Sequence, residues 1–146
     1  MHHIALVTSV PDLHTARILA SAGVPYISFQ QEISNLPDIQ AWLEGPEIGI
    51  QIENPELSLP QVDFLIVKDA DYDLYSFSGK KIFWITQDVH WSKPYGALLN
   101  VSPSVDHQQV TVFNKYTAQF EDMDHSFRFW LDCIDDATSF ERIFLS

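Results

Sequence analysis

The sequence contains only one cysteine, Cys133, which excludes an internal disulfide framework. So little cysteine is typical of a reducing compartment, and we expect a cytoplasmic protein. No apolar run reaches the roughly 18 residues that a membrane-spanning helix needs. The first residues also lack the basic region and the small-residue cleavage site of an export signal. Neither a membrane protein nor a secreted protein is expected.

Basic residues are scarce as well, with 8 lysines and arginines against 20 acidic residues and a formal net charge of -12. A field of this sign repels the phosphate backbone of nucleic acids and anionic membrane surfaces. The acidic residues are scattered rather than gathered in runs, as on an ordinary solvated surface. Nucleic-acid and membrane partners are therefore not expected.

Glycine is also rare, and the 5 glycines never pair or form the Gly-x-Gly pattern with which backbone amides surround a phosphate. The 6 histidines form neither His-x-His nor His-x-x-x-His pairs, the spacings that place two metal ligands on one face of a strand or helix. We therefore predict no metal site and no cofactor.

The sequence does contain an alternation of short β-branched or aromatic runs with segments of helical periodicity. The expected strands are residues 4–10, 24–29, 48–52, 62–67 and 81–85. One predicted helix begins at Pro11-Asp12 and ends before Gly23, a second begins at Asn35-Leu36-Pro37-Asp38, and residues 71–77 form a third. This recurrence predicts βαβ units and a largely parallel sheet, in a single α/β domain that spans residues 1–146.

The alternation weakens after Thr86. The segment before the next expected strand, 97–101, is too short for a helical crossover, so we predict a loop or a change of strand direction there. A further strand is expected at 110–113. The last segment is predicted to be a C-terminal helix, because apolar residues recur there at helical spacing: Phe120, Met123, Phe127, Trp130, Leu131 and Ile134.

The length of the chain bears on how such a sheet closes. An eight-unit (β/α) barrel typically takes about 250 residues, against 146 here. We therefore expect a truncated or incomplete TIM-barrel-like fold, with an open doubly wound sheet as the alternative. Either leaves apolar surface or an open strand edge, and a two-fold homodimer is expected to cover the apolar patch of Phe140, Ile143, Phe144 and Leu145. The alternative is a monomer whose tail folds back on its own core.

Polar residues follow the strands at the ends where parallel α/β sheets carry their chemistry. We expect a small-molecule pocket there, lined by Thr8, Ser9, Glu53 and Asn100. The candidates for catalysis are Lys68, Asp88 and His90, with Lys68 as a Schiff-base lysine if burial lowers its pKa. The competing interpretation is that strand ends become polar on leaving the core, and that Lys68 is simply ion-paired.

A family resemblance lies in the run from Leu6 to Leu13, with Ala16, Gly23, Ile27 and Phe29 after it. This run resembles the first βαβ unit of phosphoribosylanthranilate isomerase, a barrel enzyme of tryptophan biosynthesis. Residues 48–52 are similar to that family's third strand, and residues 64–69 with Leu74 are similar to its fourth strand and following turn. The resemblance covers about residues 4–86 and rests on apolar positions and one glycine.

The sequence differs where this family carries its chemistry. The resemblance places Thr8 at the general-base cysteine and Ser9 at the glycine after it, and a threonine hydroxyl is not a base near neutral pH. Asn100 stands at the general-acid aspartate and has no proton to give. The family's Gly-rich phosphate loops have no counterpart. We therefore expect a noncatalytic, isomerase-like protein that associates with a small molecule or a protein; the alternative is an active isomerase or a Schiff-base lyase of small-molecule metabolism.

Overall fold

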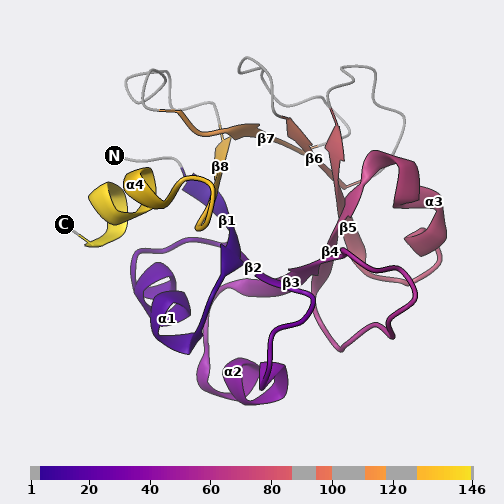
Figure 1. Ribbon diagram of the computed structural model, residues 1–146, viewed down its shortest axis with the longest axis horizontal. Helices are drawn as coiled ribbons and strands as arrows, with labels where there is room; N and C mark the ends of the chain where they lie inside the picture. Colours follow the sequence, from indigo (N-terminus) through magenta and orange to yellow (C-terminus); the bar gives the residue numbers. More distant parts are fainter. Residues whose placement is uncertain (1–3, 87–94, 100–110, 118–127, 146) are drawn as a thin grey trace.

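The computed structural model describes residues 4–86, 95–99, 111–117 and 128–145. Eight strands lie side by side, each parallel to its neighbours, and the last pairs with the first, so that the sheet closes into a barrel (Figure 1). The fold is therefore α/β and TIM-barrel-like, as the alternation predicted. The predicted truncated TIM-barrel-like fold with a largely parallel sheet is confirmed. Its sheet is closed, because β8 pairs with β1, so the alternative of an open doubly wound sheet is wrong.

The strands have four to seven residues each. They are β1 (Ile4–Val10), β2 (Tyr26–Gln30), β3 (Glu47–Gln51), β4 (Phe64–Lys68), β5 (Lys81–Thr86), β6 (Gly96–Leu99), β7 (Thr111–Lys115) and β8 (Arg128–Asp132). The first seven coincide with the predicted strands to within a few residues. Since β6 pairs in parallel with β5, the strand direction does not change after Thr86. The loop predicted between these two strands falls mostly outside the described residues.

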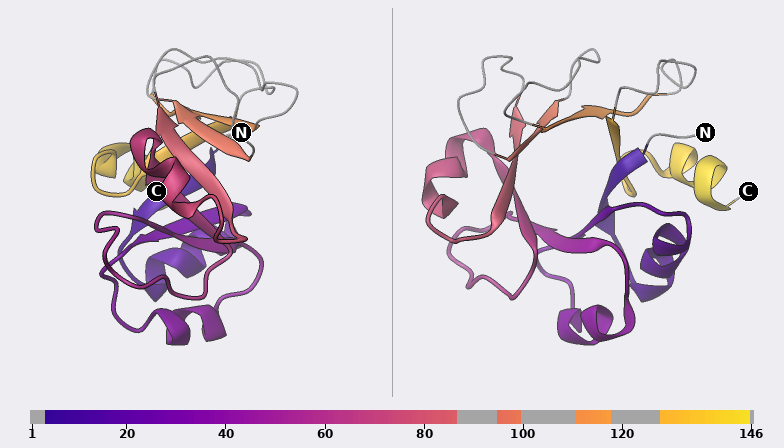
Figure 2. Two further views of the ribbon diagram at one scale, coloured as in Figure 1. Left: turned by 90° about the vertical axis from the view of Figure 1, so that its right-hand side faces the viewer. Right: turned by 180° about the vertical axis from the view of Figure 1, so that it is seen from behind.

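The helices lie on the outside of the barrel (Figures 1 and 2). They are α1 (Leu13–Ser21), α2 (Leu36–Trp42), α3 (Tyr72–Tyr75) after the 3-10 turn η1 (Asp69–Asp71), and α4 (Ala137–Phe140), which continues into the π-helical turn η3 (Glu141–Leu145). The Asp12 side chain caps α1 by accepting a hydrogen bond from the Thr15 amide at 2.8 Å. Within the described residues, none of the helices is long and apolar enough to cross a membrane.

The predicted helix over residues 120–134 is wrong where the structure describes it. Residues 128–132 form strand β8, and Trp130 packs inside the barrel while Leu131 packs on the outer face. Opposite faces for neighbouring residues are the two-residue period of a strand, not the period of a helix. The C-terminal helix begins only at Ala137, and residues 118–127 lie outside the described part.

Aromatic side chains fill the interior of the barrel. The Tyr26 ring lies edge-on to Phe64, Phe83 and Phe113, with ring centroids 5.6, 5.4 and 5.8 Å apart. These rings need room, and a Cβ atom on Gly49 would lie 2.5 Å from the Phe64 ring and 2.6 Å from its backbone oxygen. A second, larger core lies between the outer face of the sheet and the helices.

A closed barrel has no open strand edge, so a dimer is not needed to cover one. Phe140 is buried in the outer core, and Ile143 and Phe144 pack partly against it. Of the four residues in the expected C-terminal patch, Leu145 is the one that is exposed, by 53%. The tail therefore folds back on the chain's own core, while self-association stays a prediction.

Candidate functional site

Strand pairing at the seam of the barrel places Thr8 of β1 beside Asp132 of β8. The Asp132 side chain is buried, and its Oδ2 atom accepts hydrogen bonds from Thr8 Oγ1 at 2.8 Å and Ser9 Oγ at 2.7 Å. Its Oδ1 atom accepts from the backbone amides of Ile134 at 2.8 Å and Asp135 at 2.9 Å. We call Thr8, Ser9 and Asp132 the seam clasp, because they join the first strand to the last.

Ser9 has an unusual backbone in this clasp. Its φ angle is +57°, in the left-handed region that favours glycine, at a shift in the β1 register between Val7 and Val10. The resemblance to the isomerase family placed a glycine at this same position. A serine here costs conformational energy that glycine would not, and in return its hydroxyl reaches Asp132.

The clasp holds Asp132 in its ionised form. Burial alone would raise its pKa, but hydrogen bonds from the Asp135 amide, the Ser9 and Thr8 hydroxyls and the Ile134 amide together hold the pKa below the ordinary value. A carboxylate with a lowered pKa and four donors has no proton to give near neutral pH. Asp132 is therefore not a general acid, and the Thr8 hydroxyl proton is already donated to it.

A cation lies beside the clasp at the same end of the barrel. The Lys115 ammonium, at the end of β7, pairs with Asp136 and lies 4.1 Å from the centre of the Trp130 ring. Asp136 Oδ2 also accepts a hydrogen bond from the Asp132 amide at 2.9 Å. These contacts tie β7 to the turn after β8, so the Lys115 charge is already balanced within the chain.

The remaining site residues that the sequence predicted are dispersed or undescribed. Lys68 ends β4 with an exposed side chain, which is not the burial that a Schiff-base lysine needs. Glu53 is exposed after β3, and its backbone amide donates to Gln31 Oε1 at 2.9 Å. Asp88, His90 and Asn100 lie outside the described residues. Of the predicted residues that the structure describes, Thr8 and Ser9 are the two that it brings together.

Sequence reasoning missed Asp132 and Asp136. The predicted helix over residues 120–134 hid Asp132, because it covered the strand that ends at this residue, and Asp136 lies just beyond it. A signal was available in the run Phe129-Trp130-Leu131, since three large apolar side chains in succession suit a strand buried on both faces. Had residues 128–132 been predicted as a strand, Asp132 would have been one of the polar residues at a strand end, where site residues are expected.

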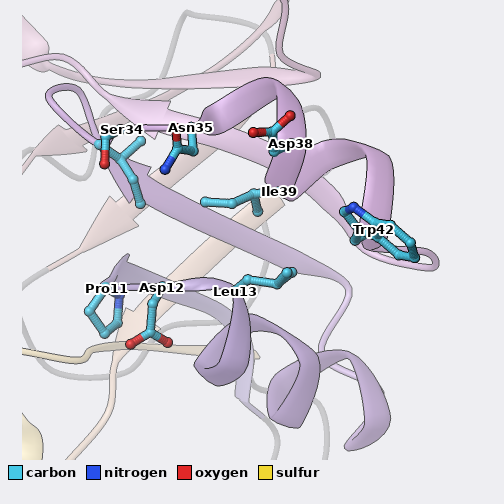
Figure 3. A pocket seen from close by; sticks show the side chains of 9 residues that line it. Pro11, Asp12, Leu13, Ser34, Asn35, Asp38, Ile39 and Trp42 are labelled. Atoms are coloured by element: carbon cyan, nitrogen blue, oxygen red, sulfur yellow. The ribbon is translucent and has the colours of Figure 1, made fainter.

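A pocket of about 440 Å³ lies between α1 and α2, next to the turns that connect β1 to α1 and β2 to α2 (Figure 3). Its lining residues are Pro11, Asp12, Leu13, Ile33, Ser34, Asn35, Asp38, Ile39 and Trp42. In Figure 3, Leu13 and Ile39 lie between the two helices, and Trp42 lies at the far end of α2 from Ser34 and Asn35. Asp12, just before α1, and Asp38, on α2, stand on opposite sides, with their carboxylate groups pointing away from each other. The pocket therefore has an apolar middle and carboxylates at its rim.

Cys133, in the turn after β8, is not a nucleophile. Burial, together with the negative charges of Asp132, Asp12 and Asp136, raises the pKa of its thiol to about 12. The group therefore stays protonated near neutral pH. Within the described residues, His, Cys, Asp and Glu side chains nowhere gather in the groups of three or more that hold a metal ion.

A smaller cavity of about 220 Å³ lies where the barrel interior opens at the start of β5 and β7, between Tyr26, Lys81 and Phe113. The Lys81 ammonium binds both carboxylate oxygens of Glu47, at 2.9 and 3.0 Å. This hydrogen bonding raises the pKa of Lys81 above its ordinary value. The cation at this cavity is thus already neutralised by its neighbour.

Comparison with known proteins gives no relative, since neither a protein-family model, nor a curated protein, nor a solved structure matches the chain. What the fold and the site define is a class of architecture, a small TIM-barrel-like α/β protein with a clasp at its seam and a pocket between its first two helices.

Proposed function

We propose that this protein is a noncatalytic, isomerase-like barrel that binds a small molecule in the pocket between α1 and α2. The observation that carries the proposal is the seam clasp. Thr8 stands where the resembling isomerase family has its general base, and its hydroxyl donates to the ionised Asp132. A threonine hydroxyl is too weak a base to abstract a proton from a substrate near neutral pH, and its hydrogen bond to Asp132 gives it a structural role instead.

The pocket supports the binding half of the proposal. Its volume of about 440 Å³ falls within the range of roughly 300–1,000 Å³ that is usual for small-molecule sites. Such sites combine an apolar lining with a few polar groups, as this pocket does with Leu13 and Ile39 between Asp12 and Asp38. The turns that follow β1 and β2 form one part of it and α2 forms another, so the pocket borders the βα loops in which this architecture places its sites and extends between the outer helices.

The noncatalytic half is tested by two activity measurements. We expect no isomerisation of phosphoribosylanthranilate above the uncatalysed rate, for the native chain and equally for Thr8→Cys. Borohydride in the presence of a small aldehyde should add no selective mass at Lys68, because its exposed side chain lacks the buried site that a Schiff-base lysine needs. Turnover above background, or selective reduction onto Lys68 rather than Lys80 and Lys81, would show that the chain is an enzyme.

The binding half is tested with three ring compounds of similar size, phenethylamine, phenethyl alcohol and hydrocinnamate. Nitrogen-15 NMR resolves the indole N–H of each tryptophan, and Trp42→Phe assigns the signal that reports on the pocket. We expect at least one compound to shift the Trp42 indole signal in a saturable way, with the Trp84 signal of the outer core unchanged. If all three leave Trp42 unmoved, the pocket does not bind small molecules of this class.

A further inference from the structure

We propose that the occupant of the pocket between α1 and α2 is a cation, an organic amine whose apolar body lies between the helices and whose ammonium group lies at the rim. This inference rests on the proposed function and deepens it, because it names the chemical class of the ligand. It follows from the charges and the rings that line the pocket.

The charges around the pocket favour a cationic ligand. Among the residues that line the pocket, Asp12 and Asp38 carry negative charges, and the lining described by the structure contains no lysine or arginine. The hydrogen bond from the Thr15 amide holds the pKa of Asp12 below its ordinary value, so that this carboxylate is ionised near neutral pH. The whole chain adds a field of the same sign, with its formal charge of -12. An anionic ligand would meet repulsion at both the rim and the surface.

The second argument is the aromatic ring at one end of the pocket. The Trp42 side chain is 68% exposed, although tryptophan usually covers its large apolar surface. Among aromatic side chains, the indole face attracts cations most strongly. Next to it, Ile39 and Leu13 offer the apolar contact that an alkyl or aromatic body needs. An amine with an apolar body complements both parts of the pocket.

The three probes differ in charge and little in shape, so their affinities test this inference directly. At low salt we expect phenethylamine to bind about five- to tenfold more tightly than phenethyl alcohol, and hydrocinnamate to bind more weakly than either. The advantage of the amine should shrink in about 1 M salt, where charges at an exposed rim are screened. Equal affinities, or the tightest binding for hydrocinnamate, would overturn the inference while leaving small-molecule binding in place.

Single variants locate the charge that matters. Asp12→Asn retains a side chain that caps a helix equally well, so it removes the charge without removing the cap. We expect Asp12→Asn and Asp38→Asn each to weaken phenethylamine binding about twofold to fivefold and to leave phenethyl alcohol unchanged. Asp73→Asn, an exposed carboxylate on α3 outside the pocket, is the matched control and should change neither affinity. Losses of equal size in all three variants would show a general field effect and contradict a cation site at this rim.

Discussion

The seam clasp makes a quantitative prediction about stability. Thr8→Val keeps the shape of the side chain and removes one hydrogen bond to the Asp132 carboxylate. A hydrogen bond to a charged group contributes roughly 1.5–3 kcal/mol, so we expect the free energy of unfolding to fall by about that amount. Total stability of a domain this size is about 5–15 kcal/mol, which makes the loss easy to measure by urea unfolding as a lower midpoint with an unchanged slope.

Ser9 gives a graded version of the same test. Ser9→Ala removes the hydrogen bond to Asp132 and keeps the strained backbone, so its cost should equal that of Thr8→Val. Ser9→Gly removes the same bond but relieves the positive φ angle, which is worth about 1 kcal/mol or more. We therefore expect Ser9→Gly to be the more stable of the two variants by about that difference.

Ser28 is the matched control for the clasp. Its hydroxyl is fully buried in β2, and in the described part of the chain it has no hydrogen-bond partner. Ser28→Ala therefore removes an unsatisfied group and should leave stability unchanged or raise it slightly. If Ser28→Ala costs as much as Thr8→Val, or if Thr8→Val changes stability by less than about 0.5 kcal/mol, the hydrogen bonds of the clasp do not stabilise the barrel.

The same clasp also predicts how the stability of the protein depends on pH. The folded pKa of Asp132 is lowered, so its stabilising contribution is present above the unfolded pKa of about 3.9 and is lost as the pH falls through the folded pKa. Asp132→Asn does not titrate. The stability gap between the native chain and this variant should stay constant from neutral pH to about pH 5 and shrink below about pH 4. A gap that narrows above pH 5 would contradict a lowered pKa.

Two further predictions concern reactivity and assembly. Because its pKa is raised to about 12, Cys133 should resist iodoacetamide at about pH 8 in the folded protein and react once the chain is unfolded in urea; fast labelling of the folded chain would contradict its burial. A homodimer sealed at the C-terminal face predicts a mass of twice 16.7 kDa by sedimentation equilibrium. We expect Leu145→Asp or Ile134→Asp to lower this mass, and Phe77→Asp, at an exposed position in the turn after α3, to leave it unchanged. A single 16.7 kDa species would refute the dimer.

The sequence predicted the elements whose signals are local. Asp12 and Gly23 bound α1, and Gly23 has the positive φ angle of +84° that its place after the helix requires. The prediction for the residues of strand β8 was wrong, because large apolar residues such as Trp130 and Leu131 fit the period of a helix and of a doubly buried strand equally well. Only pairing with β1 and β7 decides between these periods, and those partners lie more than a hundred residues away or across an undescribed segment.

The candidate site divides in the same way. Thr8 and Ser9 follow from the rule that chemistry gathers at strand ends, whereas their partner Asp132 is 124 residues from Thr8 in sequence. The pocket depends on how α1 and α2 pack beside each other, and no local pattern in the sequence predicts this packing. Ile39 and Trp42 are three residues apart, a spacing that places both on one face of a helix, yet Ile39 is buried and Trp42 is exposed beside the pocket.

The barrel closes within 146 residues because the segments that connect its strands are short, whereas the sheet itself has all eight strands. Eight parallel strands fix the diameter of a barrel, so the interior must be filled whatever the length of the chain. Here strands of four to seven residues do so with aromatic rings, Phe64, Phe83 and Phe113 around Tyr26, together with the aliphatic side chains of Leu6, Ile66 and Leu98. The outer helices are short, and residues 52–63 connect β3 to β4 without one. Among the described residues, α1 and α2 are the longest α-helices that lie side by side, and the pocket forms between them.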